Sequence, residues 1–352
     1  MPKDIIVVVN IDAKPRASES LDILLLSTEG VKDIKTYRSL DEIKVDYANK
    51  AVYSMAEALF NQGKTTLADT LIRKVRIAGI AEPESSDAMV MAIEELREKD
   101  DDWYILLTDK SDDEYVKALC EWAEATQPTE AELGAGIEDH RKVYFGQTDN
   151  KAIGIKNARC ALIYTDKLLE HADAAWLGNV GPFYPESVTW KFKRPQGISV
   201  PVLTDAEKDA LEEANINFLT TEYKREYVKN GQCCDGEFID VQLGADYIAK
   251  YMREKLYDVM LTNPKVPYTD TGFALIAGAV FETLNRAVDL GVIARDAESG
   301  KGVYTVNVPK RSDATDDEAR SRTMPDIVWE ALLEGAVHQV KVTGTLKASL
   351  SA

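Results

Sequence analysis

A stretch of alternating side chains near the C-terminus constrains the fold of this chain more than any other feature. Residues 336–350 read AVHQVKVTGTLKASL and place small or apolar side chains on one face: Ala336, Val340, Val342, Leu346, Ala348 and Leu350. Fully extended, the run would measure roughly 50 Å, whereas ordinary strands hold about 3 to 10 residues. We therefore do not expect one compact sheet to pair all of it.

Gly344 lies inside this run, and a glycine within a strand often marks a bend. The sequence predicts an inner strand over residues 337–343 and an outer arm over residues 345–350. A second strand-like run, IIVVVNI, occupies residues 5–11 at the other end of the chain. Two terminal strands indicate polymerisation by strand exchange. The residues expected in these inter-subunit arms are Ile5, Val7, Val9, Ile11, Gly344, Leu346, Ala348 and Leu350.

Length and charge narrow the classes of protein. With 352 residues, of which 45% are hydrophobic, the chain can bury a full core in two or three domains. Its net charge of −18 argues against binding to a phosphate backbone or to anionic lipid. No apolar run approaches the roughly 18 residues of a membrane span. We therefore expect neither nucleic acid nor a membrane as a partner.

The cysteines and the N-terminus suggest where the chain is made. Four cysteines in a chain of this length do not form a disulfide framework: Cys120, Cys160, Cys233 and Cys234. The first apolar run is short and has no small-residue cleavage site, so it is a poor secretion signal. These features predict synthesis in a reducing cytoplasm.

Strand and helix patterns alternate through the first two thirds of the chain. Strands are expected at residues 21–27, 74–80, 103–108, 142–145 and 161–164, and helices at 49–62, 86–99 and 112–125. Such alternation is typical of an α/β domain. From residue 226 the pattern predicts a hairpin over 226–241, with turns at Asn230-Gly231 and Asp235-Gly236.

The remaining segment predicts two helices followed by strands. The first helix is expected from about 245 to 261 and ends at Asn263-Pro264; the second has Thr269 or Asp270 as its N-cap and Gly291 near its end. Strands at 303–308 and 327–333 flank a polar linker, residues 312–322.

Catalytic motifs are weak. Gly63-Lys64-Thr65-Thr66 ends like a phosphate-binding loop, but the glycine five positions earlier is Ala58 and a helix precedes it. His140, His171 and His338 lack the spacing of a metal or nucleophile site, and His338 is expected to be packed or interfacial. Burial is the expected role of Cys233 and Cys234. Asp100, Asp101 and Asp102 are expected to form a solvated turn.

Five segments in a particular order resemble a known family. They read AAWLG from Ala174, TWKFK from Thr189, DGEFID from Asp235, GADYI from Gly244 and KVPYTD from Lys265. Together they resemble the contractile tail sheath proteins of bacteriophages and phage-tail-like particles. The resemblance covers most of the chain and is strongest from about residue 174 to residue 350.

The resemblance implies an architecture and no catalytic, cofactor or metal residues. It implies a mixed α/β fold, with an N-terminal strand arm (1–20), an outer α/β domain (21–228), a C-terminal inner sheath domain (229–344) and a C-terminal strand arm (345–352). The arms would add strands to the sheets of neighbouring subunits around a tail tube. The partners implied are further copies of the chain, in a helical array of hexameric rings, the tail tube protein, and baseplate and tail terminator proteins, in a virion tail or phage-tail-like particle.

Two other functions remain open at this point. The chain could be another tail structural protein, of the tube or the baseplate, which the shape of its assemblies would distinguish. A nucleotide-binding enzyme is the second alternative, and nucleotide affinity dependent on Lys64 would reveal it.

Overall fold

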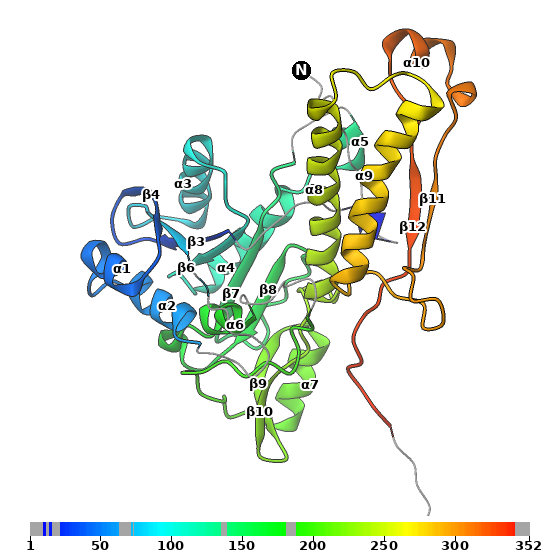
Figure 1. Cartoon of the computed structure of the whole chain (residues 1–352). Helices are drawn as coiled ribbons and strands as arrows, with labels where there is room; N and C mark the ends of the chain where they lie inside the picture. The colour runs from blue at the N-terminus through cyan, green and yellow to red at the C-terminus, as the bar shows by residue number, and fades with distance from the viewer. Residues whose placement is uncertain are drawn as a thin grey trace, which may run out of the picture.

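The structure is a computed structural model that describes residues 10–11, 14–15, 22–62, 72, 74–134, 139–180 and 188–341. A central sheet of eight strands fills the first part of the chain, and a long helix pair with a separate two-stranded ribbon stands beside it (Figure 1). The expected mixed α/β architecture is confirmed.

The order of the strands in the large sheet is β10-β9-β8-β7-β6-β3-β5-β4. The six inner strands run parallel, and the two edge strands, β4 and β10, are antiparallel to their neighbours. In chain order the strands are β3 (Ile23–Ser27), β4 (Lys32–Tyr37), β5 (Val75–Gly79), β6 (Ile105–Thr108), β7 (Val143–Thr148), β8 (Cys160–Tyr164), β9 (Asn217–Glu222) and β10 (Arg225–Lys229).

Helices cover both faces of this sheet, which explains why central strands such as β3 (ILLLS) are apolar and buried on both sides. Alternate residues of β3 face different cores: Ile23 and Leu25 pack in one, Leu24 and Leu26 in the other. The first core includes side chains of α1 (Leu40–Tyr47), α2 (Ala51–Phe60) and α6 (Ala172–Val180). The second includes α3 (Ser86–Lys99), α4 (Asp113–Ala125) and α7 (Asp205–Glu213). Two short helices, α5 (Glu130–Gly134) and η1 (Leu168–Glu170), lie in loops.

The C-terminal part is built on two long helices, α8 (Ile239–Thr262) and α9 (Asp270–Asp289). They lie side by side in Figure 1 and share a third core with the ribbon of β11 (Tyr304–Asn307) and β12 (Val328–Ala331). The start of α8 belongs to the core of the large sheet through Ile239 and Leu243, and the third core begins at Ala245. One helix thus links both parts of the molecule.

Most of the expected elements are confirmed to within a few residues, including the Thr269 cap, whose side chain accepts a hydrogen bond from the Gly272 amide. The helix expected from about 245 begins at Ile239 instead. Its first turns carry apolar residues for the sheet core, so the helical pattern there is hidden by burial on several sides. The domain boundaries at 20, 228 and 344 stay predictions.

The hairpin expected over 226–241 is wrong. Strands β9 and β10 form the hairpin, and its turn is Tyr223-Lys224, with both residues in the left-handed region that two-residue hairpin turns use. The expected turn residues Asn230, Gly231 and Gly236 do have positive φ. They belong to a compact loop with a single bridge between Gln232 and Phe238. The prediction of turns at these residues is therefore correct, but the two strands that they were expected to join do not form a hairpin.

Two further expectations need correction. The polar linker 312–322 contains the short helices η3 (Arg311–Asp313) and α10 (Asp316–Ser321), the latter begun by a capping box between Thr315 and Glu318. The inner strand expected at 337–343 is not a strand over its described residues, 337–341. A strand needs a partner for its backbone hydrogen bonds, and no described strand pairs with this segment.

Candidate assembly site

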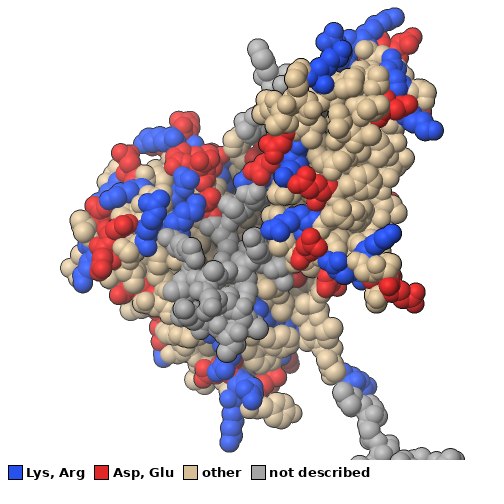
Figure 2. Space-filling view, viewed as in Figure 1, with Lys and Arg blue, Asp and Glu red and all other residues tan. Residues whose placement is uncertain are grey.

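Large apolar side chains are exposed mainly in the C-terminal part. Of the seventeen among the described residues, ten follow residue 259: Met260, Leu261, Leu275, Phe281, Val303, Val328, Leu332, Leu333, Val337 and Val340. Figure 2 shows a broad area over α9 and the ribbon with few charged side chains, whereas both signs are mixed over the α/β part. Clustered exposed apolar surface usually marks a contact with another molecule.

One exposed row runs along α9. Ala274, Leu275, Gly278 and Phe281 follow helical spacing and are all exposed. Beyond its own helix backbone, a methyl group placed on Gly278 would meet no atom of the described residues within 4 Å. The outer side of α9 is therefore open to close approach by another surface.

The ribbon offers unpaired backbone. Its inner side chains, Tyr304, Val306, Trp329 and Ala331, pack on the helix pair, while the alternate residues face outward. Its sheet contains two strands, and the other described residues add only isolated bridges at one end, between Ile293 and Leu333 and between Arg295 and Gly302. Edges of this kind can take a further strand.

Of the predicted arm residues, only Ile11 is among the residues that the structure describes. Ile11 belongs to the short strand β1 (Asn10–Ile11), which pairs antiparallel with β2 (Lys14–Pro15). The others lie outside the described residues and stay predictions: Ile5, Val7, Val9, Gly344, Leu346, Ala348 and Leu350. The Gly63–Thr66 motif is also outside them.

The helix α8 is fixed to the large sheet by a group of mostly buried polar side chains, which we call the polar seam: Tyr104, Asp139, Arg141, Arg159, Asp246 and Arg253. Tyr104, Arg141 and Arg159 stand at or just before the starts of β6, β7 and β8, so they meet at the amino edge of the parallel strands. Asp246 and Arg253 come from α8. The seam therefore joins strand starts to the helix that leads into the C-terminal part.

Asp246 is the central acceptor of the seam. Its Oδ2 accepts hydrogen bonds from the Tyr104 hydroxyl and from Nη1 of Arg159, the latter at 2.7 Å. Nη1 of Arg141 lies 3.8 Å from Oδ1. All three charged side chains are fully buried. Burial and the neighbouring Asp246 charge raise the pKa of Tyr104, so its hydroxyl stays protonated as the donor.

A second branch ties the seam to its surroundings. Asp139 accepts from Nε of Arg141 at 2.8 Å and from Nη2 of Arg253 at 3.3 Å. Burial lowers the pKa of Arg141, and the carboxylates of Asp246 and Asp139 oppose that effect. Breaking one partner of such buried pairs leaves an uncompensated charge, which is strongly destabilising.

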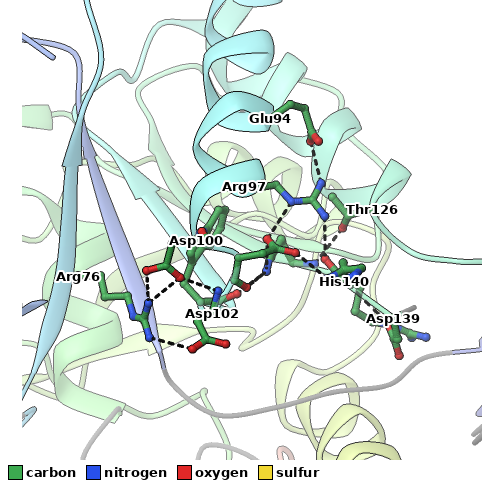
Figure 3. A network of polar contacts seen from close by, with 12 residues as sticks. Arg76, Glu94, Arg97, Asp100, Asp102, Thr126, Asp139 and His140 are labelled. Atoms are coloured by element: carbon green, nitrogen blue, oxygen red, sulfur yellow. Dashed lines mark hydrogen bonds and ion pairs between the residues drawn. The ribbon is translucent and has the colours of Figure 1, made fainter. Parts of the chain in front are cut away.

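The acidic run beside the seam is not a solvated turn, contrary to expectation (Figure 3). Asp101 accepts from Nε of Arg97 at 3.0 Å, from Nζ of Lys142 at 2.8 Å and from Nδ1 of His140 at 2.7 Å. Partial burial would raise the pKa of Asp101, but these donors outweigh it and hold that pKa well below its usual range. Asp100 pairs with Arg76 at 2.6 Å, and Asp102 alone is largely exposed. The expectation of a solvated turn is wrong because basic side chains from three parts of the chain form ion pairs with these carboxylates.

The crevice where doubly wound folds bind ligands is bridged here by hydrogen bonds between Thr28 and Asp109. That crevice lies at the carboxyl ends of the strands where the order reverses, here between β3 and β6. The amide and hydroxyl of Thr28 both donate to the carboxylate of Asp109 across this point, at 2.9 Å each for the closest contacts. Among the described residues no group of three or more His, Cys, Asp or Glu side chains could hold a metal ion.

The other sequence-predicted residues are packed as structural side chains. All four cysteines are buried thiols outside any disulfide, with Cys233 and Cys234 facing different cores. His338 is packed, as expected, with Nε2 2.6 Å from the Thr189 hydroxyl. None of the described helices is both long and apolar enough to span a membrane.

Comparison with known proteins identifies the C-terminal part. Residues 239–346 match the family model described as "E217 tail sheath protein gp31-like, C-terminal domain". This part of the chain belongs to the tail sheath family. The resemblance inferred from the five sequence segments is thereby confirmed. A comparison with curated protein sequences gives no match.

Solved structures extend the likeness to the whole fold. A chain of the anti-feeding prophage helical sheath in the contracted state has a TM-score of 0.67 at 13% identity, covering 97% of this chain and 95% of that chain. A chain of the anti-feeding prophage baseplate has a TM-score of 0.67 at 14% identity, covering 96% of this chain and 98% of that chain. The sheath domain and the α/β part together thus share one fold with subunits of a phage-tail-like particle.

The polar seam was not predicted from the sequence. Arg141 and Arg159 lie two residues and one residue before buried strands, and Asp246 lies in the largely buried first half of α8. Charged residues embedded in apolar surroundings were the available signal, but one sequence does not tell which of them meet.

Proposed function

We propose that the chain is the structural subunit of a contractile tail sheath, which polymerises around a tail tube as a helical array and contracts to drive the tube through a target cell envelope. One observation carries the proposal: a tail sheath domain that leaves a two-stranded ribbon with unpaired edges among exposed apolar side chains. A head-to-tail contact that does not close on itself generates a helical array.

The terminal arms supply the strands that the ribbon lacks. A donated strand contributes backbone hydrogen bonds along a free edge and side chains at alternate positions. The run 336–350 and the run 5–11 have the required period of two. The arms keep neighbouring subunits joined while the subunit bodies repack. A kinetic barrier can then hold the extended array at a higher free energy than the contracted array.

The partners follow from this role. They are further copies of the chain, a tail tube protein, and the baseplate and terminator proteins at the ends of the sheath, all within a virion tail or phage-tail-like particle. We expect no catalytic activity of the subunit, because contraction uses energy stored during assembly. The likeness to a baseplate chain favours a baseplate subunit as the second candidate.

Matched charge insertions test the proposal. Val328 lies on the ribbon and is 57% exposed, whereas Val45 lies on α1 and is 83% exposed. Val328→Lys should abolish helical assembly because it buries an ammonium in a subunit contact, and Val45→Lys should assemble as the wild type does. Negative-stain microscopy decides the outcome. Discs or short rings from the unmodified chain would favour the baseplate, and long tubes from Val328→Lys would remove the ribbon from the contact.

A further inference from the structure

The chain leaves the body of the protein just after the ribbon. The backbone amide of Glu334 still bonds to the carbonyl of Val292. From residue 335 to residue 341 every residue is exposed except His338. Val337 and Val340, on either side of it, are 76% and 75% exposed. A single side chain therefore ties this segment to the rest of the molecule.

That side chain occupies a recess on the α/β part. Nε2 of His338 lies 2.6 Å from Oγ1 of Thr189. The imidazole stands edge-on to Phe238, with ring centroids 4.7 Å apart, and to Phe192, at 6.2 Å. Tyr227 packs behind Phe192 at 5.3 Å. We call Thr189, Phe192, Tyr227 and Phe238 the His338 recess.

The recess is held in shape without His338. Phe192 has a φ of +63°, a conformation that L-residues rarely adopt. Its amide donates to the carbonyl of Val228 at 3.0 Å, and the Val228 amide donates to the carbonyl of Lys193 at 2.8 Å. These bonds pin the loop against β10, while Phe238 is fixed as the N-cap of α8. An imidazole can enter a preformed site at small entropic cost.

The electrostatic surroundings favour a neutral imidazole. Burial and, next, the charge of Lys191 lower the pKa of His338. Lys191 is in turn affected by the charges of Lys229, Glu212 and Glu222. Asp240, in the first turn of α8, is affected by those of Glu237 and Lys193. Burial raises the pKa of Asp240 to about 6, so this carboxyl titrates in the same range and must be separated by experiment. The contacts described for His338 include no carboxylate that would stabilise its proton.

We propose that His338 clips the root of the C-terminal arm into the recess of Thr189, Phe192, Tyr227 and Phe238, and that protonation of the imidazole opens the clip. The arm then pivots at residue 339, five positions before Gly344, and residues 339–352 can reach roughly 45 Å from it. The clip itself depends only on the described contacts. Its effect on assembly rests on the proposed function, since an arm held at His338 loses less conformational entropy when it binds a neighbouring subunit.

Tryptic cleavage of the full, unassembled chain measures the clip. Lys341 is exposed and lies three residues beyond His338, so a protease can bind around it only when the segment leaves the recess. Lys347 lies farther along the same arm and provides the reference rate. The quantity measured is the initial cleavage rate after Lys341 divided by the rate after Lys347.

Thr189 variants test the contact. Thr189→Val keeps the shape but removes the hydroxyl, which also accepts from the Lys191 amide at 3.3 Å within the loop. Loss of the hydrogen bond to His338 should raise the rate ratio about fivefold. Thr189→Ser keeps the hydroxyl and should match the wild type. Urea unfolding midpoints verify that both variants fold. Equal ratios for Val, Ser and wild type would overturn the clip.

The pH dependence tests the opening. His338 is neutral in the recess and has its ordinary pKa when free, so docking is strongest above pH 6.5 and weakens as pH falls below it. The rate ratio should rise between pH 7.5 and pH 5.5 in the wild type and stay flat in His338→Gln, which does not titrate. An unchanged pH response in His338→Gln would assign the effect to Asp240 and overturn the switch. A chain whose clip behaves as expected but never assembles would keep the clip and overturn the sheath role.

Discussion

Arg159 donates a hydrogen bond from Nη1 to Oδ2 of Asp246 at 2.7 Å, and neither side chain is exposed to solvent. The contact spans 87 residues of sequence and joins the start of β8 to the long helix of the sheath domain. It therefore fixes α8, the first helix of the pair, to the sheet of the α/β part.

Asp246→Asn should therefore destabilise the fold strongly. The amide keeps the shape and can still accept from Tyr104, but Arg159 loses its buried countercharge and Arg141 keeps only that of Asp139. The expected loss is about 3 to 5 kcal/mol of unfolding free energy, measured by urea denaturation. Asp317→Asn is the matched control, because its pair with Arg320 is 96% and 80% exposed and should contribute within about 0.5 kcal/mol. Equal effects of the two variants would show that the seam does not hold α8.

Substitution by alanine should have opposite effects on stability at Gly178 and at Gly278. A Cβ on Gly178 in α6 would lie 2.2 Å from the carbonyl oxygen of Leu59, at the end of α2. Gly178→Ala must push these helices apart and should cost about 1 to 3 kcal/mol.

A Cβ on Gly278 in α9 would lie within 4 Å of no described atom beyond its own helix. Gly278→Ala should therefore stabilise the isolated subunit by up to about 1 kcal/mol, because alanine has the higher helix propensity. Thermal unfolding of the two variants measures both effects. A stabilised Gly178→Ala would contradict the close helix contact.

Asp173 should make stability fall as pH rises. This carboxyl is buried, and burial raises its pKa to about 7. A raised carboxyl pKa means that the folded state holds the proton more tightly, so its stability declines between the unfolded pKa and pH 7. From pH 5 to pH 8 the wild type should lose about 2 to 3 kcal/mol that Asp173→Asn does not lose. Urea midpoints at both pH values measure it, with the exposed Asp33→Asn as control. Parallel pH profiles of wild type and Asp173→Asn would exclude this cause.

The periodic elements of the α/β part could be predicted because their patterns are local. The segment 86–99 shows helical spacing of Met89, Ile93 and Leu96, and all three are buried in α3 as expected. The cap at Thr269 likewise depends on neighbours only a turn away. These features are set by residues close in sequence, so one chain suffices to find them.

Contacts between distant segments could not be predicted in the same way. Asp101 is surrounded by Arg97, His140 and Lys142, and only the sheet topology brings residues 140 and 142 beside it. The turn at Tyr223-Lys224 contains no glycine, so nothing in its sequence outweighed the Asn-Gly pair that follows. The predicted arms depend on a partner outside the chain, which a single subunit cannot provide.

The most direct test of the account is the assembly of a chain ending after Thr343, which lacks the outer arm with Leu346, Ala348 and Leu350. Electron microscopy and sedimentation compare it with the full chain, each alone and with a tail tube protein. We expect the full chain to form long hollow tubes, and the shortened chain to stay unassembled with an unchanged urea midpoint. Sheath-like tubes from the shortened chain would contradict assembly through the terminal arm.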